Sequence, residues 1–383
     1  MYLLTNTHIT AILHNLSTIH LNHLHDALAT SLAQFSAQQN SPNPTTEIHQ
    51  PQRSHFVTSR GITTLTMPVS DTSSTGVKVV TLAPGSAAQG AITIYEAEGA
   101  LLGVLNAEQI TAFRTALASM IALKLHVRDT HNSDSEKEKK SVVVFGAGKQ
   151  AEWHVRLVLR VLGAEHIARI TVVNRGRERL SALERGVLND LRGVYPSVRF
   201  ETLEHDPNAS TMGSGNIGSP DSDPLRLTLF GADIIFCTTP SIFPLFSDAY
   251  LKDETTGRYN KQRFIALIGS YRPDMQEIDS DTILGPLAKG GNGKIVVDSR
   301  EACLVEAGEL LRARVSAGDL VEVGELWTQG RENAIGNLNR GSVEEGGNVI
   351  FKCVGMALMD MVVGKALIEI ARELGVGMEV TDF

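Results

Sequence analysis

The feature that most constrains the fold is a glycine-rich hexapeptide between an apolar run, 141–145, and an amphipathic stretch, 150–162. It consists of Gly146, Ala147, Gly148, Lys149, Gln150 and Ala151. The apolar run is typical of a buried strand and the stretch after it of a helix. Such a hexapeptide alone is also compatible with an ordinary turn before a helix. Between a strand and a helix, it favours a turn that holds the pyrophosphate of a dinucleotide at the helix N-terminus.

Apolar runs and amphipathic stretches alternate over the part of the chain that follows this strand. The predicted strands are 142–145, 170–174, 198–203, 234–238, 264–268 and 295–297. This alternation predicts the α/β class, with a doubly wound parallel sheet of the Rossmann type. Residues 204–224, rich in Ser, Gly, Asp and Asn, are interpreted as a disordered insertion in a surface loop.

The first part of the chain has a different pattern. A helical pattern over 19–32 and a polar loop over 38–52 precede short strand-like runs at 62–67, 77–82 and 91–95, and a helix over 107–127 follows. The segment 128–140 contains no apolar residue and is interpreted as a linker. A last helix is predicted from near Asn348 to Leu374, packed on the first domain. We therefore predict a Rossmann domain over 126–344 and a mixed α+β domain formed by 1–125 and 345–383.

Composition narrows the functional classes. A formal charge of −8 and a pI near 5.9 argue against a nucleic-acid partner, because phosphate binding needs a basic surface. The three cysteines lack CxxC spacing, so no metal site is predicted. No window of 18 uninterrupted apolar residues and no leader pattern is present, so we expect no membrane partner and a cytoplasmic location. A small-molecule substrate is favoured.

The residues after the second Rossmann strand bear on which dinucleotide binds. An NAD enzyme usually has an acidic residue there, for the ribose hydroxyls. Here Asn174 is followed by Arg175, Arg177 and Arg179. These arginines are compatible with a solvated basic helix start, but guanidinium groups also match a 2′-phosphate. We predict that Arg175, helped by Arg177 or Arg179, favours NADPH, with NADH as a possible second cofactor.

Three cations of the first domain are candidates for the substrate site, although their spacing cannot bring them together. Lys78 lies in a strand-like run and on composition alone is best explained as an edge-strand lysine. Arg114 lies in an apolar helical stretch, which alone suggests a buried ion pair with an acid. Arg53 alone is an unremarkable loop cation.

Six segments in order along the chain resemble the ornithine cyclodeaminase/μ-crystallin family. They are Lys78-Val79-Val80-Thr81, Ile110 to Ala116, the turn Gly146 to Ala151, Cys237-Thr238-Thr239, Gly269 to Asp274 and Phe351 to Gly355. The resemblance implies a homodimer and a discontinuous domain for substrate binding and dimerisation around a Rossmann domain.

The resemblance also implies the roles of individual residues. Arg53, Lys78 and Arg114 would face the substrate, with arginine binding its carboxylate and Lys78 next to the reacting carbon as the catalytic residue. Such roles suit an α-imino acid, because an arginine can fix its carboxylate and a lysine can donate a proton. The predicted cofactor contacts are Arg114, Thr115, Gly146, Ala147, Gly148, Lys149, Gln150, Asn174, Arg175, Arg179, Cys237, Thr238, Thr239, Gly269, Ser270 and Phe351.

The sequence departs from the cyclodeaminases of this family in one loop. They carry an aspartate there that handles the second amino group of the substrate, and the matching position is Tyr271. A phenol with a pKa of about 10 is a poor replacement for that carboxylate. Asp274 is interpreted as the cap of a helix beginning near Met275. The Arg272-Pro273-Asp274 form and Asn174-Arg175 resemble the ketimine reductase branch, and Tyr271 is predicted to contact substrate.

The combined features predict an NADPH-dependent reductase of α-imino acids, such as Δ1-pyrroline-2-carboxylate or Δ1-piperideine-2-carboxylate. One alternative is an ornithine cyclodeaminase or amino-acid dehydrogenase that uses bound NAD. A second alternative is a protein that binds NADPH and a small ligand without turnover. The sequence does not define the substrate's ring size or side chain.

Overall fold

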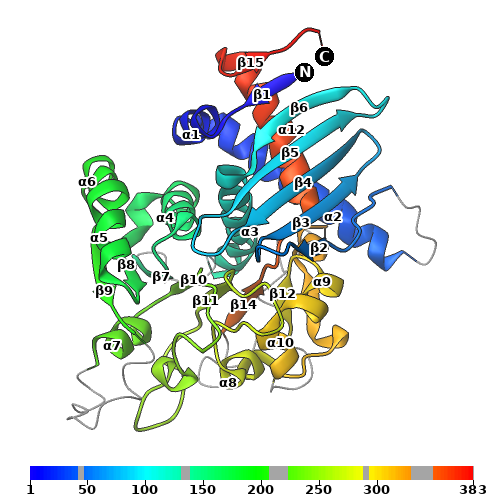
Figure 1. Cartoon of the computed structure of the whole chain (residues 1–383). Helices are drawn as coiled ribbons and strands as arrows, with labels where there is room; N and C mark the ends of the chain where they lie inside the picture. The colour runs from blue at the N-terminus through cyan, green and yellow to red at the C-terminus, as the bar shows by residue number, and fades with distance from the viewer. Residues whose placement is uncertain (42–46, 131–138, 207–222, 288–292, 329–347, 383) are drawn as a thin grey trace. The chain divides into compact units, whose positions relative to one another are not determined.

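A computed structural model describes residues 1–41, 47–130, 139–206, 223–287, 293–328 and 348–382 (Figure 1). The chain divides into two compact units, Met1–Ala118 with Gly355–Phe383, and Ser119–Val354. The sequence predicts divisions after residues 125 and 344, whereas the structure divides the chain after Ala118 and Val354. The first division falls inside one continuous helix, α3 (Ala107–Thr130), so no loop in the sequence signals it. The insertion predicted at 204–224 lies almost entirely outside the described residues.

The first unit contains a seven-stranded sheet in the order β15-β1-β6-β5-β4-β3-β2. Its strands are β1 (Tyr2–Leu4), β2 (Ser54–Val57), β3 (Thr63–Ser70), β4 (Ser74–Leu82), β5 (Gln89–Glu96), β6 (Leu101–Asn106) and β15 (Met378–Glu379). Strands β2 to β6 pair antiparallel, each with the next along the chain. The three strand-like runs of the sequence lie in β3, β4 and β5. Strand β4 lies between β3 and β5, so it is an inner strand of the sheet.

Three helices belong wholly to the first unit: α1 (Asn6–His14), α2 (Thr18–Asn40) and α12 (Ala357–Leu374). Helix α12 packs on β3, β4 and β5 and on α2, which Figure 1 shows as a red helix crossing the sheet. Glycines permit this close approach, because a Cβ at Gly364 would lie 2.7 Å from the Ile94 side chain. The contact brings the C-terminal residues of the chain against strands formed near its beginning.

The second unit contains an eight-stranded, entirely parallel sheet in the order β13-β12-β14-β11-β10-β7-β8-β9. Its strands are β7 (Lys140–Phe145), β8 (Ile167–Asn174), β9 (Arg199–Glu204), β10 (Ile234–Cys237), β11 (Phe264–Leu267), β12 (Ile295–Val297), β13 (Leu320–Glu322) and β14 (Val349–Lys352). All the predicted strands are present, which confirms the α/β class.

The predicted helix start near Asn348 is wrong. Residues 349–352 form β14, which pairs with β11 on one side and β12 on the other, and α12 begins only at Ala357. The run is Val-Ile-Phe-Lys, and β-branched and aromatic residues favour a strand in a sheet covered on both faces. A short apolar run next to a helix cannot be separated from that helix by periodicity alone.

Helices cover both faces of the parallel sheet. In chain order they are α3 in its C-terminal half, α4 (Lys149–Leu162), α5 (Arg177–Leu183), α6 (Asn189–Val194), α7 (Pro224–Phe230), α8 (Ser280–Leu284), α9 (Arg300–Glu306), α10 (Gly308–Arg312) and α11 (Val323–Thr328). A π-turn, Glu184–Leu188, joins α5 to α6, and short 3-10 turns are formed by Ala164–His166, Asp248–Leu251, Gly285–Leu287 and Ala317–Asp319.

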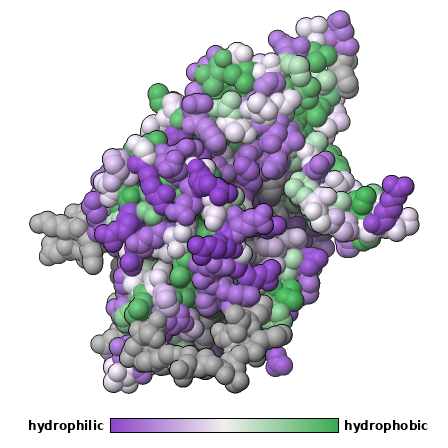
Figure 2. Space-filling model, turned by 60° about the vertical axis from the view of Figure 1, so that its left-hand side comes forward, coloured by the Kyte–Doolittle hydropathy of each residue, from purple (hydrophilic) through white to green (hydrophobic). Residues whose placement is uncertain are grey.

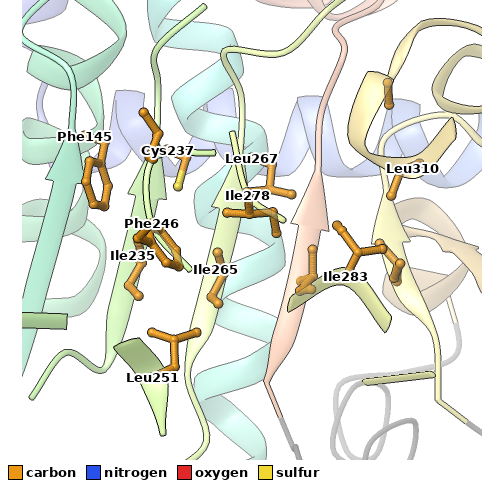
Figure 3. Packing of buried hydrophobic residues seen from close by; sticks show 14 of the residues in the cluster. Phe145, Ile235, Cys237, Phe246, Leu251, Ile265, Leu267, Ile278, Ile283 and Leu310 are labelled. Atoms are coloured by element: carbon orange, nitrogen blue, oxygen red, sulfur yellow. The ribbon is translucent and has the colours of Figure 1, made fainter. Parts of the chain in front are cut away.

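The hydrophobic core on one face of this sheet is shown in Figure 3. Alternate residues of adjacent strands, including Ile235 and Ile265, point to the same side and form one hydrophobic cluster with Leu251, Ile283 and Leu310 from the connecting segments. On the opposite face, the His154 ring of α4 lies 4.9 Å from that of Phe236. The sheet is therefore buried on both faces, as a parallel sheet requires.

Asp274 does not cap a helix, contrary to the sequence interpretation. Its carboxylate pairs with Arg272 at 3.0 Å, and both side chains are more than half exposed. The next helix, α8, is capped by Asp279, whose side chain accepts from Thr282 N. Asp-x-x-Thr is an equally good capping sequence, so sequence alone could not decide between the two aspartates.

The visible surface in Figure 2 is mostly hydrophilic, with hydrophobic residues interspersed. Within the described residues, one helix segment, 107–127 of α3, is long and apolar enough to span a membrane by length and composition, and most of it is buried. Core helices have the same character when they are surrounded by other elements. The packing of Leu117, Met120 and Ile121 therefore accounts for the apolar composition of this segment.

Candidate functional site

The glycine-rich turn lies between β7 and α4. Gly146 has φ +114°, and a Cβ there would lie 2.6 Å from Thr238 Oγ1, so no other residue fits this backbone. Gly148 is the N-cap of α4, and no side chain caps the free N–H groups of its first turn. A Cβ at Gly148 would meet nothing within 4 Å, so the space above the turn is open to a ligand. This geometry fits a pyrophosphate group.

The loops after β10 and β11 lie against this turn. Thr238 Oγ1 donates to Phe145 O at 2.6 Å, which fixes the loop after β10 to the end of β7. Gly269 packs so closely on the neighbouring loop that a Cβ would lie 2.1 Å from Thr239 O. The predicted contacts in the turn and in these two loops are thereby brought to the carboxyl ends of adjacent strands, where α/β sheets bind ligands. Cys237 and Phe351 are fully buried within their strands.

A cavity of about 290 Å³ lies beside these loops in the second unit. Arg175, Arg179 and His205 contribute cationic or titratable side chains to its lining, and Asn174 is also part of it. Arg177 does not line the cavity, and its guanidinium lies 3.6 Å from the Glu204 carboxylate. Arg179, and not Arg177, therefore lines the same cavity as Arg175.

His205 was not identified from the sequence. It directly follows β9, and burial lowers its pKa. Ile242 and Phe243 form an apolar part of the lining of the same cavity, and their side chains are about half exposed. An apolar wall beside a basic one suits an adenosine whose base packs on the apolar side and whose ribose carries a phosphate on the basic side. The strand-end position of His205 is the signal that could have indicated it.

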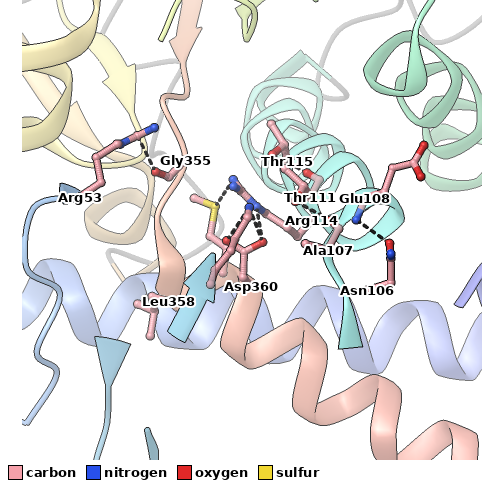
Figure 4. A network of polar contacts seen from close by, with 12 residues as sticks. Arg53, Asn106, Ala107, Glu108, Thr111, Arg114, Thr115, Gly355, Leu358 and Asp360 are labelled. Carbon is pink, nitrogen blue, oxygen red and sulfur yellow. Dashed lines mark hydrogen bonds and ion pairs between the residues drawn. The ribbon is translucent and has the colours of Figure 1, made fainter. Parts of the chain in front are cut away.

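The first unit contains a buried cluster of charges around Asp360 (Figure 4). Lys78 Nζ lies 3.0 Å from Asp360 Oδ1 and 3.2 Å from Oδ2, and Arg114 Nε lies 3.2 Å from Oδ1. All three side chains are at most 5% exposed. Lys78 is thus not an edge-strand lysine with a solvated ammonium group. The ion pair that composition suggested for Arg114 is present, and Asp360 is its acid.

Gly355 connects Arg53 to this cluster. Arg53 Nη2 donates to Gly355 O at 3.2 Å (Figure 4). Gly355 has φ +85°, and a Cβ there would lie 2.5 Å from Arg114 Nη1. The glycine backbone therefore lies against both guanidinium groups. The fold brings together Arg53, Lys78 and Arg114, which family resemblance alone groups at the level of the sequence.

The electrostatics of Lys78 follow from this arrangement. Burial lowers its pKa, Arg114 and Arg53 lower it further, and Asp360 partly offsets them, leaving a pKa of about 8. The neighbours that act on Lys78 are one carboxylate and two guanidinium groups. With Lys78 protonated, cations exceed anions, so an anionic ligand would be stabilised here. A lysine with this pKa can both hold and release a proton near neutral pH.

Asp360 is a second functional candidate of the site that the sequence did not indicate. Its signal was a single acid inside the apolar run 354–363, because such acids are rarely buried without a partner.

The other predicted contacts occupy varied environments. Thr115 is buried and donates to Thr111 O at 2.9 Å, and Lys149 pairs with Glu152 at 3.0 Å. Tyr271 is half-buried in the loop after β11. In the part of the chain that the structure describes, no group of three or more His, Cys, Asp or Glu side chains is placed to hold a metal ion.

A parallel α/β sheet with this turn, together with a separate α+β unit, defines a Rossmann-type protein of two units. The ornithine cyclodeaminase/mu-crystallin family profile matches residues 9–190, and the chain belongs to this family. The Saccharomyces cerevisiae protein YGL159W is 30% identical over 313 residues, which are 79% of this chain and 80% of that protein.

Two further similarities concern proteins with named activities. A Bacillus cereus Δ1-pyrroline-2-carboxylate reductase is 29% identical over 321 residues, covering 80% of both chains. The structure of the Thermococcus litoralis Δ1-pyrroline-2-carboxylate reductase with NADH and L-proline has a TM-score of 0.71 and 22% identity. That comparison covers 99% of this chain and 100% of the other, and it confirms the fold.

Proposed function

We propose that this protein is an oxidoreductase that uses a reduced nicotinamide cofactor, preferentially NADPH, to reduce the C=N bond of α-imino acids. The observation that carries the proposal is the buried cluster of Lys78, Arg114 and Asp360, with Arg53 nearby, in a chain that also contains a dinucleotide-binding turn. Similarity to reductases named for Δ1-pyrroline-2-carboxylate supports a cyclic imino acid as the substrate.

The charges of the cluster suit this substrate class. An α-imino acid has a carboxylate next to its C=N carbon, and the excess of cations over anions would bind that carboxylate. Arg53 and Arg114 would orient the substrate through it, because a guanidinium group can hold a carboxylate with two parallel hydrogen bonds. Asp360 would keep Lys78 and Arg114 in place.

Lys78 is the proposed proton donor. The bound cofactor would supply the hydride for the carbon of the C=N bond, and the nitrogen must gain or retain a proton for the amine product to form. Asp360 accepts hydrogen bonds from Lys78 Nζ and thereby favours the protonated amine, while burial and the arginines make its proton easier to release. These opposing effects suit a general acid near neutral pH.

The basic side of the cavity supports the choice of NADPH. Arg175 and Arg179 line it together with Asn174, and no acidic residue is among its lining residues. The 2′-phosphate carries one or two negative charges near neutral pH, which two guanidinium groups can balance. NADH remains an alternative cofactor that lacks only this group. We also propose a homodimer, on the basis of the family, which light scattering of the purified protein would test.

A cofactor-consumption panel tests the proposed activity. NADPH and NADH oxidation would be followed with Δ1-pyrroline-2-carboxylate, Δ1-piperideine-2-carboxylate and pyruvate plus methylamine, and ammonia release with ornithine. We expect stoichiometric NADPH oxidation with at least one cyclic imino acid. Ammonia release from ornithine without net cofactor change would instead identify a cyclodeaminase. Binding of NADPH and ketimines without turnover would identify a binding protein.

A further inference from the structure

Glu277 lies in the loop between β11 and α8, and its side chain is fully buried. One of its carboxylate oxygens, Oε1, accepts from Thr239 N at 2.8 Å. The other, Oε2, accepts from Gly269 N at 2.7 Å and from Ser270 N at 3.3 Å. A single carboxylate thus joins the backbone of the loop after β10 to that of the loop after β11.

Two further buried charges, Lys352 and Glu309, interact electrostatically with this carboxylate, and Lys352 also holds the second loop. Lys352, on β14, pairs with Glu309 of α10 at 2.8 Å and donates to Ser270 O, and both side chains are fully buried. Gly308 permits this arrangement, because it lies so close to the 273–275 backbone that a Cβ would meet Met275 O at 2.0 Å. Buried charges are costly unless they are paired, so their presence at these loops needs an explanation.

The loops that Glu277 joins also carry two buried hydroxyl groups. In the described structure, Thr239 Oγ1 and Ser270 Oγ are buried and have no hydrogen-bond partner. Thr239 lines the cavity that contains Arg175 and Arg179. Leu245 N also donates to Glu277 O at 2.8 Å, and Leu245 lines the same cavity. Backbone and side-chain contacts of Glu277 therefore both act on the cavity wall.

We propose that Glu277 is a positioning residue for the dinucleotide: it fixes the loops of Thr239 and of Gly269 and Ser270 in the conformation that binds the cofactor. This inference rests on the proposed function, since it assumes that these loops contact a dinucleotide. Glu277 acts through their backbone N–H groups. Its removal is expected to weaken cofactor binding, beyond any loss of stability.

Protonation provides a readout that a purely structural role does not predict. Burial raises the pKa of Glu277 to about 7, with Lys352 lowering it and Glu309 raising it. The thiol of Cys237 is the other titratable group that interacts with it, and burial raises its pKa well above the ordinary value. All three hydrogen-bond partners of the carboxylate are backbone N–H groups, which need acceptors. Protonation of Glu277 would add an O–H donor that faces these N–H donors and would weaken their hydrogen bonds. Cofactor affinity should therefore fall as the pH falls through about 7.

The experiment measures the Kd of NADH by fluorescence titration at several pH values for wild type, Glu277→Gln and Asp248→Asn. NADH is used because it lacks the 2′-phosphate, whose own pKa of about 6 would add a pH dependence. Asp248 is the matched control, a buried carboxylate of the same unit that interacts with Tyr259 and Lys252. Titrations of other groups, such as His205, are common to all three proteins.

For wild type we expect the Kd to rise severalfold from about pH 8 to about pH 6. At the higher pH, Glu277→Gln should weaken binding by about tenfold and lose most of the pH dependence, because a charged hydrogen-bond acceptor is lost. Asp248→Asn should keep the wild-type dependence of Kd on pH even if its melting temperature falls.

Equal Kd values for wild type and Glu277→Gln would overturn the inference. If Glu277→Gln does not fold, a wild-type Kd that is independent of pH would overturn it. Absence of NADH and NADPH binding to wild type would instead contradict the proposed function.

Discussion

Lys78 Nζ lies 3.0 Å from Asp360 Oδ1, although the two residues are 282 positions apart in the chain. The contact forms because α12 packs across β3, β4 and β5, which places its first turn against the lysine of β4. A lysine buried on an inner strand needs such a partner. Asp360 supplies one negative charge for Lys78, Arg53 and Arg114. The cluster therefore keeps a net positive charge, which suits a substrate carboxylate.

Replacement of Lys78 tests its proposed catalytic role. Lys78→Met keeps an unbranched side chain that is one atom shorter and removes the proton donor, so kcat should fall by about 100-fold to about 10,000-fold. The Kd of NADPH should change little. Lys365→Met is a suitable control, because Lys365 is a lysine of α12 that contacts the exposed Ser73. Turnover of Lys78→Met at the wild-type rate would remove Lys78 from the mechanism.

The pH dependence of reduction provides a second test. Only protonated Lys78 can act as the donor, so kcat/KM should decline as the pH rises through about 8, the pKa of this lysine. Asp360 raises that pKa, so Asp360→Asn should move the decline to lower pH. Titration of the substrate itself cannot produce this shift, because the substrate is the same in both assays. A decline at the same pH in both proteins would show that Lys78 does not control it.

Arg53 allows the carboxylate contact to be tested through the substrate. Arg53→Met should raise KM for Δ1-pyrroline-2-carboxylate by about tenfold or more, because a charge-assisted hydrogen bond is lost. The same substitution should matter much less for Δ1-pyrroline, which has no carboxylate. Arg60→Met, at an exposed position of the same unit, is the control. An equal effect on both substrates would mean that Arg53 does not bind the carboxylate.

Arg175 and Arg177 form a matched pair for cofactor preference. Arg175 lines the cavity, whereas Arg177 is exposed and lies near Glu204. Arg175→Asp should reduce kcat/KM for NADPH by about 100-fold, while the value for NADH changes far less, because the aspartate repels a 2′-phosphate. Arg177→Asp should retain most of the NADPH preference. The comparison is made from steady-state kinetics with both cofactors, and equal preference in wild type and Arg175→Asp would contradict the assignment.

Local patterns predicted the second unit well and the first unit only in part. The strand, glycine turn and helix around Gly146 are consecutive in the chain, so their geometry follows from neighbouring residues. The same applies to the alternation that predicted most of the parallel sheet. Strand β14 escaped prediction because its place between β11 and β12 depends on residues far away in the sequence. Its residues form a strand because they pair with β11 and β12 on either side.

The substrate cluster could not be derived from spacing. Arg53, Lys78, Arg114 and Asp360 come from a loop, a strand and two helices, and only the packing of the first unit brings them together. Family resemblance indicated the three cations, but it did not indicate their acid. Glu277 was missed for a related reason, since its partners are backbone N–H groups, which leave no mark on the sequence.

Transfer of labelled hydride tests the central claim most directly. NADPH carrying deuterium at the transferable position of nicotinamide C4 would be incubated with Δ1-pyrroline-2-carboxylate or Δ1-piperideine-2-carboxylate, and the products analysed by mass spectrometry and NMR. We predict that the deuterium appears at the α-carbon of proline or pipecolate, with one NADPH consumed for each product. Unlabelled product, or no product from either imino acid with NADPH or NADH, would contradict the proposed function.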